Sequence, residues 1–389
     1  MSTHKHVDLI IIGGGCAGLS LALKLSELGK RCPKVLIIEQ RLQYVNDKTW
    51  CFWDVGNPDH KSLAQHAWEK FEIRHKQNVH TYSCAANKYL MLPSDVFYQH
   101  AIANIALNPN IELITGEEIL EDPVKQKSIW HMQTSVLNCS AKLVVDTRPP
   151  KKTAAAATLW QSFVGYEVEV DSAQFSPEKF VLMDFDDNFI EGTAFIYFLP
   201  TSSQKALIEY TVFSEKIIAH NELISLLEDS LHKYTANMPY KVLRTEYGVL
   251  PMGNQLLLQP VDKTYIFAGL FAGAARPSSG YAFQRIQLWA KNCSSAIVNE
   301  SKLCKFQKDS FLKRFMDGLF LRVIKSNHPI AANIFETLFK NCDITVAIKF
   351  LSDQANIVDS IQIIKSMPQQ PFIKALPRFL FEKIFLKIK

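Results

Sequence analysis

The amino-acid sequence predicts an α/β fold in which a Rossmann-like nucleotide-binding domain is interleaved with a second domain built on an antiparallel sheet. Three observations support this prediction. A glycine-rich turn joins an apolar strand to a helix near the N-terminus, the centre of the chain alternates aromatic and β-branched residues, and the C-terminal region has helical periodicity. With 389 residues, of which 48% are hydrophobic and 21% charged, the chain is long enough for two domains with their own cores.

The first element expected is a βαβ unit that binds a dinucleotide. An apolar strand over residues 8–12 precedes a helical pattern, and a second apolar strand over residues 35–38 ends on Glu39. Three glycines at G-x-G-x-x-G spacing join the first strand to the helix: Gly13, Gly15 and Gly18. In such units the first glycine allows a tight turn, the second lets backbone approach a pyrophosphate, and the third allows close helix–strand packing. Because all parts agree, we prefer a dinucleotide site to a glycine-rich turn without a ligand.

The position of this unit in the chain and the charge of Glu39 indicate which dinucleotide to expect. Cys16 and Ala17 open the helix, whose free N–H groups favour phosphate. Cys16 is expected to be a small residue tolerated there rather than a reactive thiol. Glu39 can accept hydrogen bonds from a ribose diol and would repel the 2′-phosphate of NADP. A unit that starts at residue 7 is typical of FAD enzymes, so FAD is the first expectation and NAD the second.

The remaining elements divide the chain into three parts. The nucleotide-binding domain is expected to take residues 1–70, 128–158 and 245–300. The substrate domain is expected to take residues 71–127 and 159–244, and residues 301–389 to form a helical region. Four segments of the substrate domain have the alternation of antiparallel strands: residues 162–170, 180–185, 195–200 and 206–213.

Shorter patterns complete the prediction. A helix over residues 92–106 is expected to be capped by Ser94. Strands over residues 142–148 and 265–269 are expected to return to the nucleotide sheet, the first with Asp146 at its carboxyl end, where it can contact the cofactor. Residues 281–298 have the pattern of a helix.

Several classes of protein are not indicated by the sequence. Eight cysteines without CxxC spacing suggest reduced thiols in the cytosol and no zinc site, and the histidines lack metal-ligand spacing. No apolar stretch reaches the ~18 residues of a membrane span, and the first apolar run is a strand rather than a signal peptide. The net charge of +5 is modest, and no basic face suggests nucleic acid.

Five sequence blocks resemble the lycopene cyclase family. They are DKTWCFW (residues 47–53), IEYTVFS (208–214), YGVLPMG (247–253), GAARPSSGYAFQRIQ (273–287) and FMDGLFLRVI (315–324). The resemblance implies a flavoprotein of the aromatic-hydroxylase type and, among cyclases, the bacterial FAD-dependent lycopene beta-cyclases. It further implies an enzyme that forms β-ionone rings at the ends of linear lycopene without net redox change. Reduced FAD would be the active form, with NADPH or NADH as the electron source.

Ring closure needs a proton on one alkene carbon and a base that later removes a proton from the ring. A general acid for this step must lie in an apolar pocket, where burial keeps a carboxyl protonated. Glu209 lies in an apolar strand and matches the acid of the family's block; the alternative is a carboxylate on a solvated strand face. Asp184, in a second apolar strand, could orient Glu209 or polarise water near the flavin, or be a strand-end acid facing solvent.

Other residues are candidates for contact with the flavin. Ser279, Gly280 and Tyr281 form a turn into a helix, where backbone N–H groups could hold the anionic edge of a flavin. The ring of Tyr281 could also stabilise a carbocation. Lys48, in the DKTW loop, could contact FAD, but a free surface lysine is the alternative.

The C-terminal segment, residues 371–389, is basic and amphipathic, and residues 311–324 have a similar pattern. A long hydrocarbon cannot cross water, so we expect peripheral attachment to the cytoplasmic face of a membrane. The alternative is a helix that packs on the domain and is solubilised by its lysines. Two other functions stay open: an FAD-dependent monooxygenase or hydroxylase of an apolar substrate, and an FAD-binding relative that acts on another isoprenoid. The ring isomer, the number of ends closed and the oligomeric state stay open as well.

Overall fold

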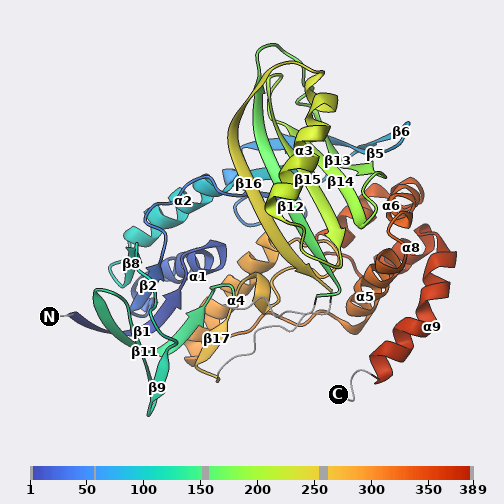
Figure 1. Cartoon of the computed structure of the whole chain (residues 1–389). Coiled ribbons are helices and arrows are strands. Elements are labelled where there is room, and N and C mark those ends of the chain that lie inside the picture. The colour runs from blue at the N-terminus through green and yellow to red at the C-terminus, as the bar shows by residue number, and fades with distance from the viewer. Residues whose placement is uncertain (1–2, 57, 151–156, 254–261, 386–389) are drawn as a thin grey trace.

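The computed structural model describes residues 3–56, 58–150, 157–253 and 262–385 (Figure 1). Its elements form two seven-stranded sheets, a small three-stranded sheet whose strands alternate in sequence with those of the large sheets, and a series of C-terminal helices. Figure 1 shows the N-terminal sheet at one side of the molecule, the second large sheet at the top, and the C-terminal helices beside the second sheet.

The first sheet has the strand order β8-β2-β1-β11-β10-β9, and β17 adds to β11. Five strands are parallel: β1 (Thr3–Ile12), β2 (Val35–Glu39), β8 (Ile111–Thr115), β11 (Leu137–Asp146) and β17 (Tyr265–Phe267). The antiparallel strands are β9 (Val124–Gln126) and β10 (Ile129–Gln133). The parallel strands place Gly13, Glu39 and Asp146 at one edge of the sheet, because each follows or ends a strand there.

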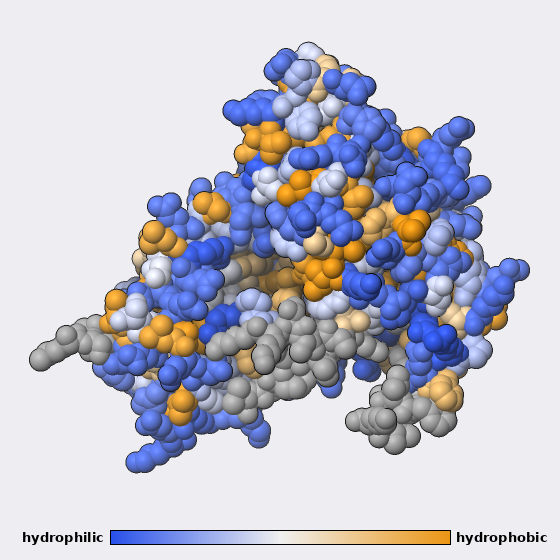
Figure 2. Space-filling view, in the orientation of Figure 1, coloured by the Kyte–Doolittle hydropathy of each residue, from blue (hydrophilic) through white to orange (hydrophobic). Residues whose placement is uncertain are grey.

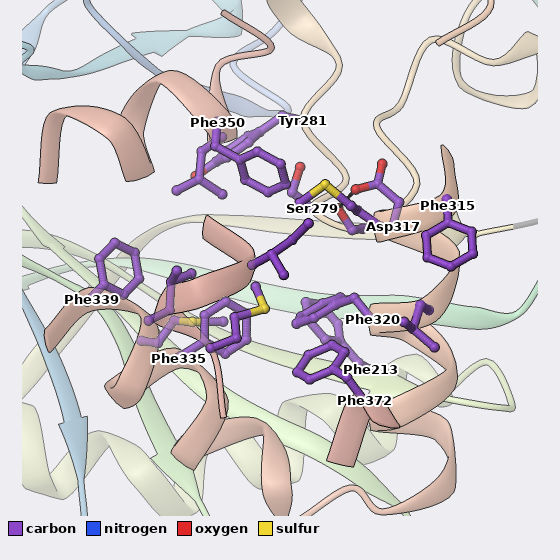
Figure 3. A pocket seen from close by; sticks show the side chains of 18 of the residues that line it. Phe213, Ser279, Tyr281, Phe315, Asp317, Phe320, Phe335, Phe339, Phe350 and Phe372 are labelled. Carbon is purple, nitrogen blue, oxygen red and sulfur yellow. Dashed lines mark hydrogen bonds between the residues drawn. The ribbon is translucent and has the colours of Figure 1, made fainter. Parts of the chain in front are cut away.

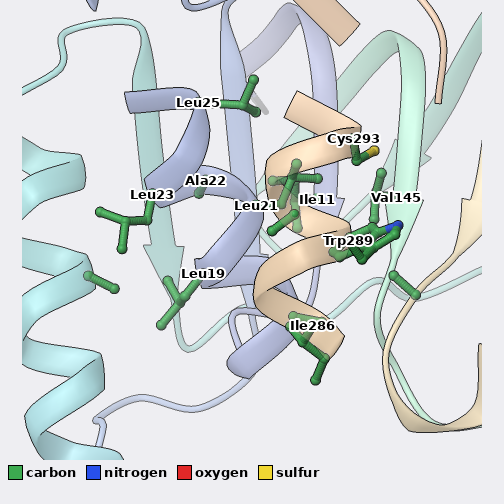
Figure 4. Packing of buried hydrophobic residues seen from close by; sticks show 14 of the residues in the cluster. Ile11, Leu19, Leu21, Ala22, Leu23, Leu25, Val145, Ile286, Trp289 and Cys293 are labelled. Atoms are coloured by element: carbon green, nitrogen blue, oxygen red, sulfur yellow. The ribbon is translucent and has the colours of Figure 1, made fainter. Parts of the chain in front are cut away.

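Three helices cover one face of this sheet: α1 (Cys16–Ser26), α2 (Ser94–Ala106) and α4 (Phe283–Glu300). Figure 4 shows α1 and α4 side by side, with Leu21, Ile286 and Trp289 packed between them and the sheet. Leu21 has no exposed surface, and a fully buried leucine contributes roughly 1.5–3 kcal/mol. The helix and the strands of the predicted βαβ unit are therefore packed together through fully buried apolar side chains.

The second sheet has the order β16-β12-β15-β14-β13-β5-β6. Its strands are β5 (Lys70–His75), β6 (Asn78–Ser83), β12 (Leu159–Val170), β13 (Lys179–Asp186), β14 (Gly192–Pro200), β15 (Lys205–Ser214) and β16 (Tyr240–Met252). All neighbours are antiparallel except β13 and β5. Helix α3 (His220–Thr235) covers one face.

The predicted division into domains needs two corrections. Residues 94–126 were expected in the substrate domain, but α2, β8 and β9 belong to the first sheet, where β8 pairs with β2. The boundary expected at residue 245 falls inside β16, which belongs wholly to the second sheet. Strand pairing depends on long-range contacts, so a local pattern of apolar residues could not assign these strands to a sheet.

The small sheet and the remaining helices complete the fold. The sheet contains β3 (Thr49–Trp53), β4 (His66–Trp68) and β7 (Tyr89–Pro93), and short 3₁₀ helices occur at Gly29–Arg31, Lys61–Leu63 and Leu270–Ala272. The C-terminal helices are α5 (Phe311–Ser326), α6 (Ile330–Asn341), α7 (Ile344–Leu351), α8 (Ile357–Ser366) and α9 (Gln369–Phe385). Asp343 caps α7, and a capping box of Asn356 and Asp359 begins α8.

The two faces of the second sheet have different partners. Along β15, Ile208, Tyr210 and Val212 pack under α3, whereas Leu207 and Phe213 pack with the C-terminal helices. Side chains alternate along a strand, so Glu209 points to the same face as Leu207 and Phe213. Figure 2 shows hydrophobic side chains at the middle of this view, within a mostly hydrophilic surface. Within the described ranges, no helix has the length and apolar character needed to cross a bilayer.

Candidate active site

The glycine-rich turn has the geometry that phosphate binding requires. Gly13 has a φ of +93°, which favours glycine, and a Cβ on Gly18 would lie 2.0 Å from the carbonyl oxygen of Gly13. Gly15 precedes α1 as its N-cap and offers no side chain to the free N–H groups of Cys16 and Ala17. A Cβ on Gly15 would find no atom nearer than Arg41 Nη2 at 3.9 Å. The space beside Gly15 is therefore open, as a ligand would need.

A cleft of about 640 Å³ opens at this edge of the first sheet. Glu39 and Asp146 both line it, at the ends of β2 and β11. The Glu39 carboxylate accepts hydrogen bonds from the N–H of Gly14 at 2.6 Å and from the N–H of Arg41 at 2.8 Å. The Asp146 carboxylate accepts from the N–H of Arg148 at 3.0 Å. Each carboxylate thus holds the backbone N–H group of the arginine that follows it two positions later in the chain.

This repeated arrangement brings two guanidinium groups to the cleft. Arg41 Nε donates to Glu39 at 3.0 Å, and Arg148 Nη2 donates to Asp146 at 2.7 Å. Tyr265 also donates to Asp146 at 2.7 Å, so the Asp146 carboxylate anchors protein groups and is not free for a ligand. Arg41 and Arg148 were not among the residues predicted from the sequence, although a basic residue two positions after each acid was the available signal. Guanidinium groups suit the phosphates of a dinucleotide.

The Cys16 thiol in this loop is protonated. Burial raises the pKa of this thiol to about 12, so it stays neutral near pH 7. A neutral thiol is a poor nucleophile, which agrees with the expectation that Cys16 is a small residue tolerated at the helix start.

The turn that holds Ser279, Gly280 and Tyr281 lies directly before α4. Gly280 has a φ of +72°, and a Cβ there would lie 2.6 Å from Gln161 Oε1. Gln161 Oε1 and Ser279 Oγ are buried and have no hydrogen-bond partner within the described residues. Buried polar atoms are normally paired, so this turn is able to take a polar ligand group.

The same turn is fastened to the C-terminal helices. Arg276 is buried, and its Nη2 lies 3.1 Å from Asp317 Oδ1 on α5. Ser278 Oγ donates to the same oxygen at 2.8 Å. The Arg276 guanidinium also lies 4.1 Å from the centre of the Phe350 ring on α7. These contacts hold the turn against helices that line the cavity described below.

Lys48 does not line the nucleotide cleft. Its Nζ is 3.5 Å from the carbonyl oxygen of Tyr247. The N–H groups of Asp47 and Lys48 each donate to Ser94 Oγ at 3.0 Å. Ser94 was predicted to cap α2, but Pro93 is the N-cap and Ser94 is the first helical residue, whose hydroxyl holds the DKTW loop instead.

Glu209 faces a second carboxyl group, that of Glu246 on the edge strand β16. Thr211 Oγ1 donates to Glu209 Oε1 at 2.7 Å. Arg244 Nη1 donates to Glu246 Oε2 at 2.7 Å, and Thr49 Oγ1 donates to the same oxygen at 3.0 Å. Burial, and then the charge of Glu246, raise the pKa of Glu209 to about 8. Glu209 is therefore not a carboxylate on a solvated strand face, and it carries its proton near pH 7.

Asp184 lies on the other face of the same sheet. Its Oδ2 accepts hydrogen bonds from Lys233 Nζ at 2.6 Å and from the Tyr234 hydroxyl at 2.7 Å, both on α3. The predicted role of orienting Glu209 is wrong, because the sheet separates the two acids. The alternative of an acid facing solvent is wrong as well, since Asp184 is buried. A register shift between Val181 and Asp184 breaks the simple alternation along β13.

An apolar cavity of about 220 Å³ lies between the second sheet and the C-terminal helices. Figure 3 shows aromatic side chains around it, among them Phe213 of β15, Tyr281 of the turn, and Phe335 and Phe372 of the C-terminal helices. Tyr197 also lines the cavity and is the direct cross-strand partner of Glu209. The cavity therefore ends close to the protonated carboxyl of Glu209.

Phenol groups flank this end of the cavity. The hydroxyl oxygens of Tyr281 and Tyr89 are 3.2 Å apart. Burial raises the pKa of Tyr281 to about 12, so its ring is neutral near pH 7. Faces of neutral aromatic rings attract a cation. Among the described residues, no group of three or more His, Cys, Asp and Glu side chains could hold a metal ion.

Comparisons with known proteins agree with this architecture. Residues 8–376 match the protein family described as lycopene cyclase protein. A lycopene beta-cyclase of Pantoea ananas is 23% identical, with 95% of this chain and 97% of that protein covered. A geranylgeranyl bacteriochlorophyll reductase-like protein of Thermoplasma acidophilum has a TM-score of 0.65 at 13% identity, with 97% of this chain and 100% of that chain covered. A p-nitrophenol 4-monooxygenase of Pseudomonas putida has a TM-score of 0.58 at 16% identity, with coverages of 95% and 98%. The fold is thus the one predicted, that of the aromatic-hydroxylase type of flavoprotein.

Proposed function

This chain belongs to the lycopene cyclase family, and on that premise we propose that it closes β-ionone-type rings at the ends of lycopene or a related linear polyene. Apart from family membership, the main support for this proposal is the position of Glu209 beside the apolar cavity. A carboxyl group that keeps its proton near pH 7 lies beside an apolar cavity with aromatic walls. Such a cavity suits the end of a hydrocarbon chain, and such a carboxyl suits proton donation to an alkene.

The reaction follows from these groups. Glu209 donates its proton to the inner carbon of the terminal double bond, which leaves a tertiary cation on the outer carbon, the one that carries two methyl groups. The next double bond attacks this cation and closes the ring, and loss of a ring proton restores neutrality without net redox change. The aromatic faces of Tyr281 and Tyr197 stabilise the positive charge on the way. The apolar walls exclude water, which would otherwise capture the cation.

FAD is the cofactor that we propose for the cleft of the first sheet. The open space beside Gly15, the helix N-terminus, and the guanidinium groups of Arg41 and Arg148 suit its pyrophosphate. The unpaired atoms of Gln161 and Ser279 suit the polar edge of its ring. A bound reduced flavin would supply negative charge beside the cation. NADPH or NADH is the proposed source of the electrons that keep it reduced.

The substrate would come from a membrane at which the protein is peripheral, on the cytoplasmic face. Apolar side chains of α8 and α9 are exposed: Ile357, Val358, Ile361, Ile364, Ile373 and Leu380. Ile364 and Phe372 belong to the same two helices and line the cavity. The exposed face and the cavity are therefore continuous. The basic end of the tail, residues 386–389, lies outside the described residues.

Expression in a bacterium that accumulates lycopene tests the function. We expect the red pigment to be replaced by a cyclic isomer of unchanged mass, identified by chromatography and mass spectrometry. A product heavier by oxygen, with oxygen consumed, would support the monooxygenase alternative. Unchanged lycopene beside folded, flavin-loaded protein would direct attention to another isoprenoid.

A further inference from the structure

We propose that Glu209 and Glu246 act as a carboxyl pair that shares one proton, in which Glu246 is the positioning residue that keeps this proton on Glu209. The proposal rests on the proposed cyclase function and adds to it the group that sets the state of the acid. Neither Glu246 nor the residues that hold it were predicted from the sequence.

The sheet brings the two carboxyl groups together across a glycine. Strand β12 lies between β15 and β16, and Gly165 of β12 pairs with Glu209 on one side and with Glu246 on the other. A Cβ on Gly165 would lie 3.2 Å from Glu246 Cγ and 3.5 Å from Glu209 Cβ. Any side chain at this position would stand between the two acids. Gly165 thus leaves the room in which the two carboxyls meet.

The two acids have unequal partners. Glu246 accepts hydrogen bonds from Arg244 and Thr49, and Arg244 Nη2 donates in turn to Thr49 Oγ1 at 2.8 Å. Among the described residues, Glu209 accepts a hydrogen bond from Thr211, and no cation donates to it. One guanidinium N–H and one hydroxyl thus donate to the same oxygen of Glu246, and a charge-assisted hydrogen bond favours the ionised form of its acceptor. Burial raises the pKa of both acids, but Arg244 and Thr49 oppose this rise at Glu246, whereas the charge of Glu246 adds to it at Glu209. We therefore assign the carboxylate to Glu246 and the proton to Glu209.

The other titratable or charged groups around the pair do not change this assignment. They are Arg244 and Lys48, whose charges favour ionised Glu246; Glu167, which holds Arg244 Nε at 3.1 Å; and Cys51 and Tyr197, whose pKa values burial raises. The thiol and the phenol are neutral near pH 7. The negative charge nearest to Glu209 is thus that of Glu246, and it opposes ionisation of Glu209.

A shared proton explains how one site serves both proton transfers. When the proton of Glu209 moves to the alkene carbon, two buried carboxylates are left side by side. Their repulsion makes the pair strongly basic, so it removes a proton from the ring carbon as the new double bond forms. One C–C bond forms, one proton leaves and one returns. No proton is consumed per ring.

The test compares Glu246→Gln with wild-type holoenzyme. Glutamine keeps the shape but removes the charge that opposes ionisation of Glu209. We expect the alkaline limb of the pH profile for ring formation to move to lower pH by at least one unit, and activity above that limb to fall about tenfold per unit. Infrared absorption of a protonated carboxyl at pH 7 should fall by about half or more in this variant. Glu169→Gln, on the neighbouring strand β12, removes a half-exposed carboxylate that pairs with Lys205 at 3.3 Å, and it should leave both measurements unchanged.

Gly165→Ala separates the carboxyls without changing their number, and it should move the profile in the same direction even if Glu246→Gln folds poorly. A wild-type pH profile and carboxyl band in both variants would overturn the proposal while leaving the cyclase function intact. If the wild type forms no rings but the carboxyl band falls in Glu246→Gln, the pair stands and the proposed function fails.

Discussion

Two acids in apolar strands of one sheet have opposite environments. Glu209 meets another carboxyl and a hydrophobic cavity, whereas Asp184 meets the ammonium of Lys233 and the hydroxyl of Tyr234. The first environment disfavours ionisation of Glu209, whereas the second ties Asp184 to a cation and a hydroxyl of α3. An acid that must donate a proton near neutral pH therefore belongs at Glu209, and Asp184 has a structural role.

Replacement of these two acids separates chemistry from stability. Glu209→Gln should lower ring formation by ~10²–10⁴-fold, the usual contribution of a general acid, while the flavin stays bound. Asp184→Asn removes a charge from an ion pair and should lower the unfolding temperature, but not ring formation per folded molecule. Product formation and thermal unfolding of both variants check this. An active Glu209→Gln beside an inactive, folded Asp184→Asn would move the acid to Asp184.

A side chain added at Gly15 would extend into open space, whereas one added at Gly18 would clash with the backbone. Gly15→Val places its side chain in open space, so the protein should fold normally but be purified without flavin. Flavin absorbance and thermal unfolding measure the two effects. Gly18→Ala is the contrast, since its Cβ would lie 2.0 Å from a backbone oxygen and should destabilise the fold itself. A yellow, fully loaded Gly15→Val protein would contradict a pyrophosphate site at this turn.

Helices and strands that depend on contacts between residues close in sequence could be predicted from the sequence. The βαβ unit, the four central strands and the C-terminal helices follow from spacing and alternation of side chains. The pair of Glu209 and Glu246 could not be predicted, because it needs the order of three strands in space. The face of Asp184 was also unpredictable, since a register shift in β13 breaks the period of two. Ser94 has the residue type of a cap, but a distant loop uses its hydroxyl.

Helix α8 offers a test of membrane contact. Ile357 and Val358 are 70% and 72% exposed and lie in its first turn, where acidic residues suit the helix dipole. Ile357→Asp with Val358→Asp should therefore keep the helix but weaken binding to neutral lipid vesicles about tenfold or more, through loss of apolar burial. Sedimentation with vesicles measures this.

The matched control for α8 carries the same charge change elsewhere. Leu107→Asp with Val136→Asp alters two exposed apolar residues, one at the end of α2 and one in the connection between β10 and β11, and this variant should bind vesicles as the wild type does. Ring formation from detergent-dispersed lycopene should persist in both variants, since none of these residues lines the cavity. Equal sedimentation of the α8 variant and the wild type would place the membrane contact on another surface.

At the scale of the whole molecule, the buried pair affects the stability of the fold as a function of pH. Glu209 has a pKa of about 8 in the folded protein, whereas an unfolded glutamic acid titrates near 4.3. Between these values the folded state holds the extra proton, so the free energy of unfolding falls as pH rises, by up to about 1.4 kcal/mol per unit.

Denaturant unfolding at pH 5, 6.5 and 8 should show this fall in the wild type, and Glu209→Gln should reduce it. The variant should therefore gain most in relative stability at pH 8. A parallel pH dependence in both proteins would mean that Glu209 is ionised in the folded state.

The last strand of the first sheet comes from a late part of the sequence. β17 pairs with β11 only after the whole second sheet has intervened in the sequence, and α4 then covers the face beside α1. During synthesis the glycine-rich turn leaves the ribosome among the first residues, yet the sheet and helix layer around it are completed only after about residue 300. A growing chain therefore carries an unfinished nucleotide site while the second sheet is being made. We expect the cofactor to be acquired near the end of translation or after it, rather than by the nascent N-terminal segment.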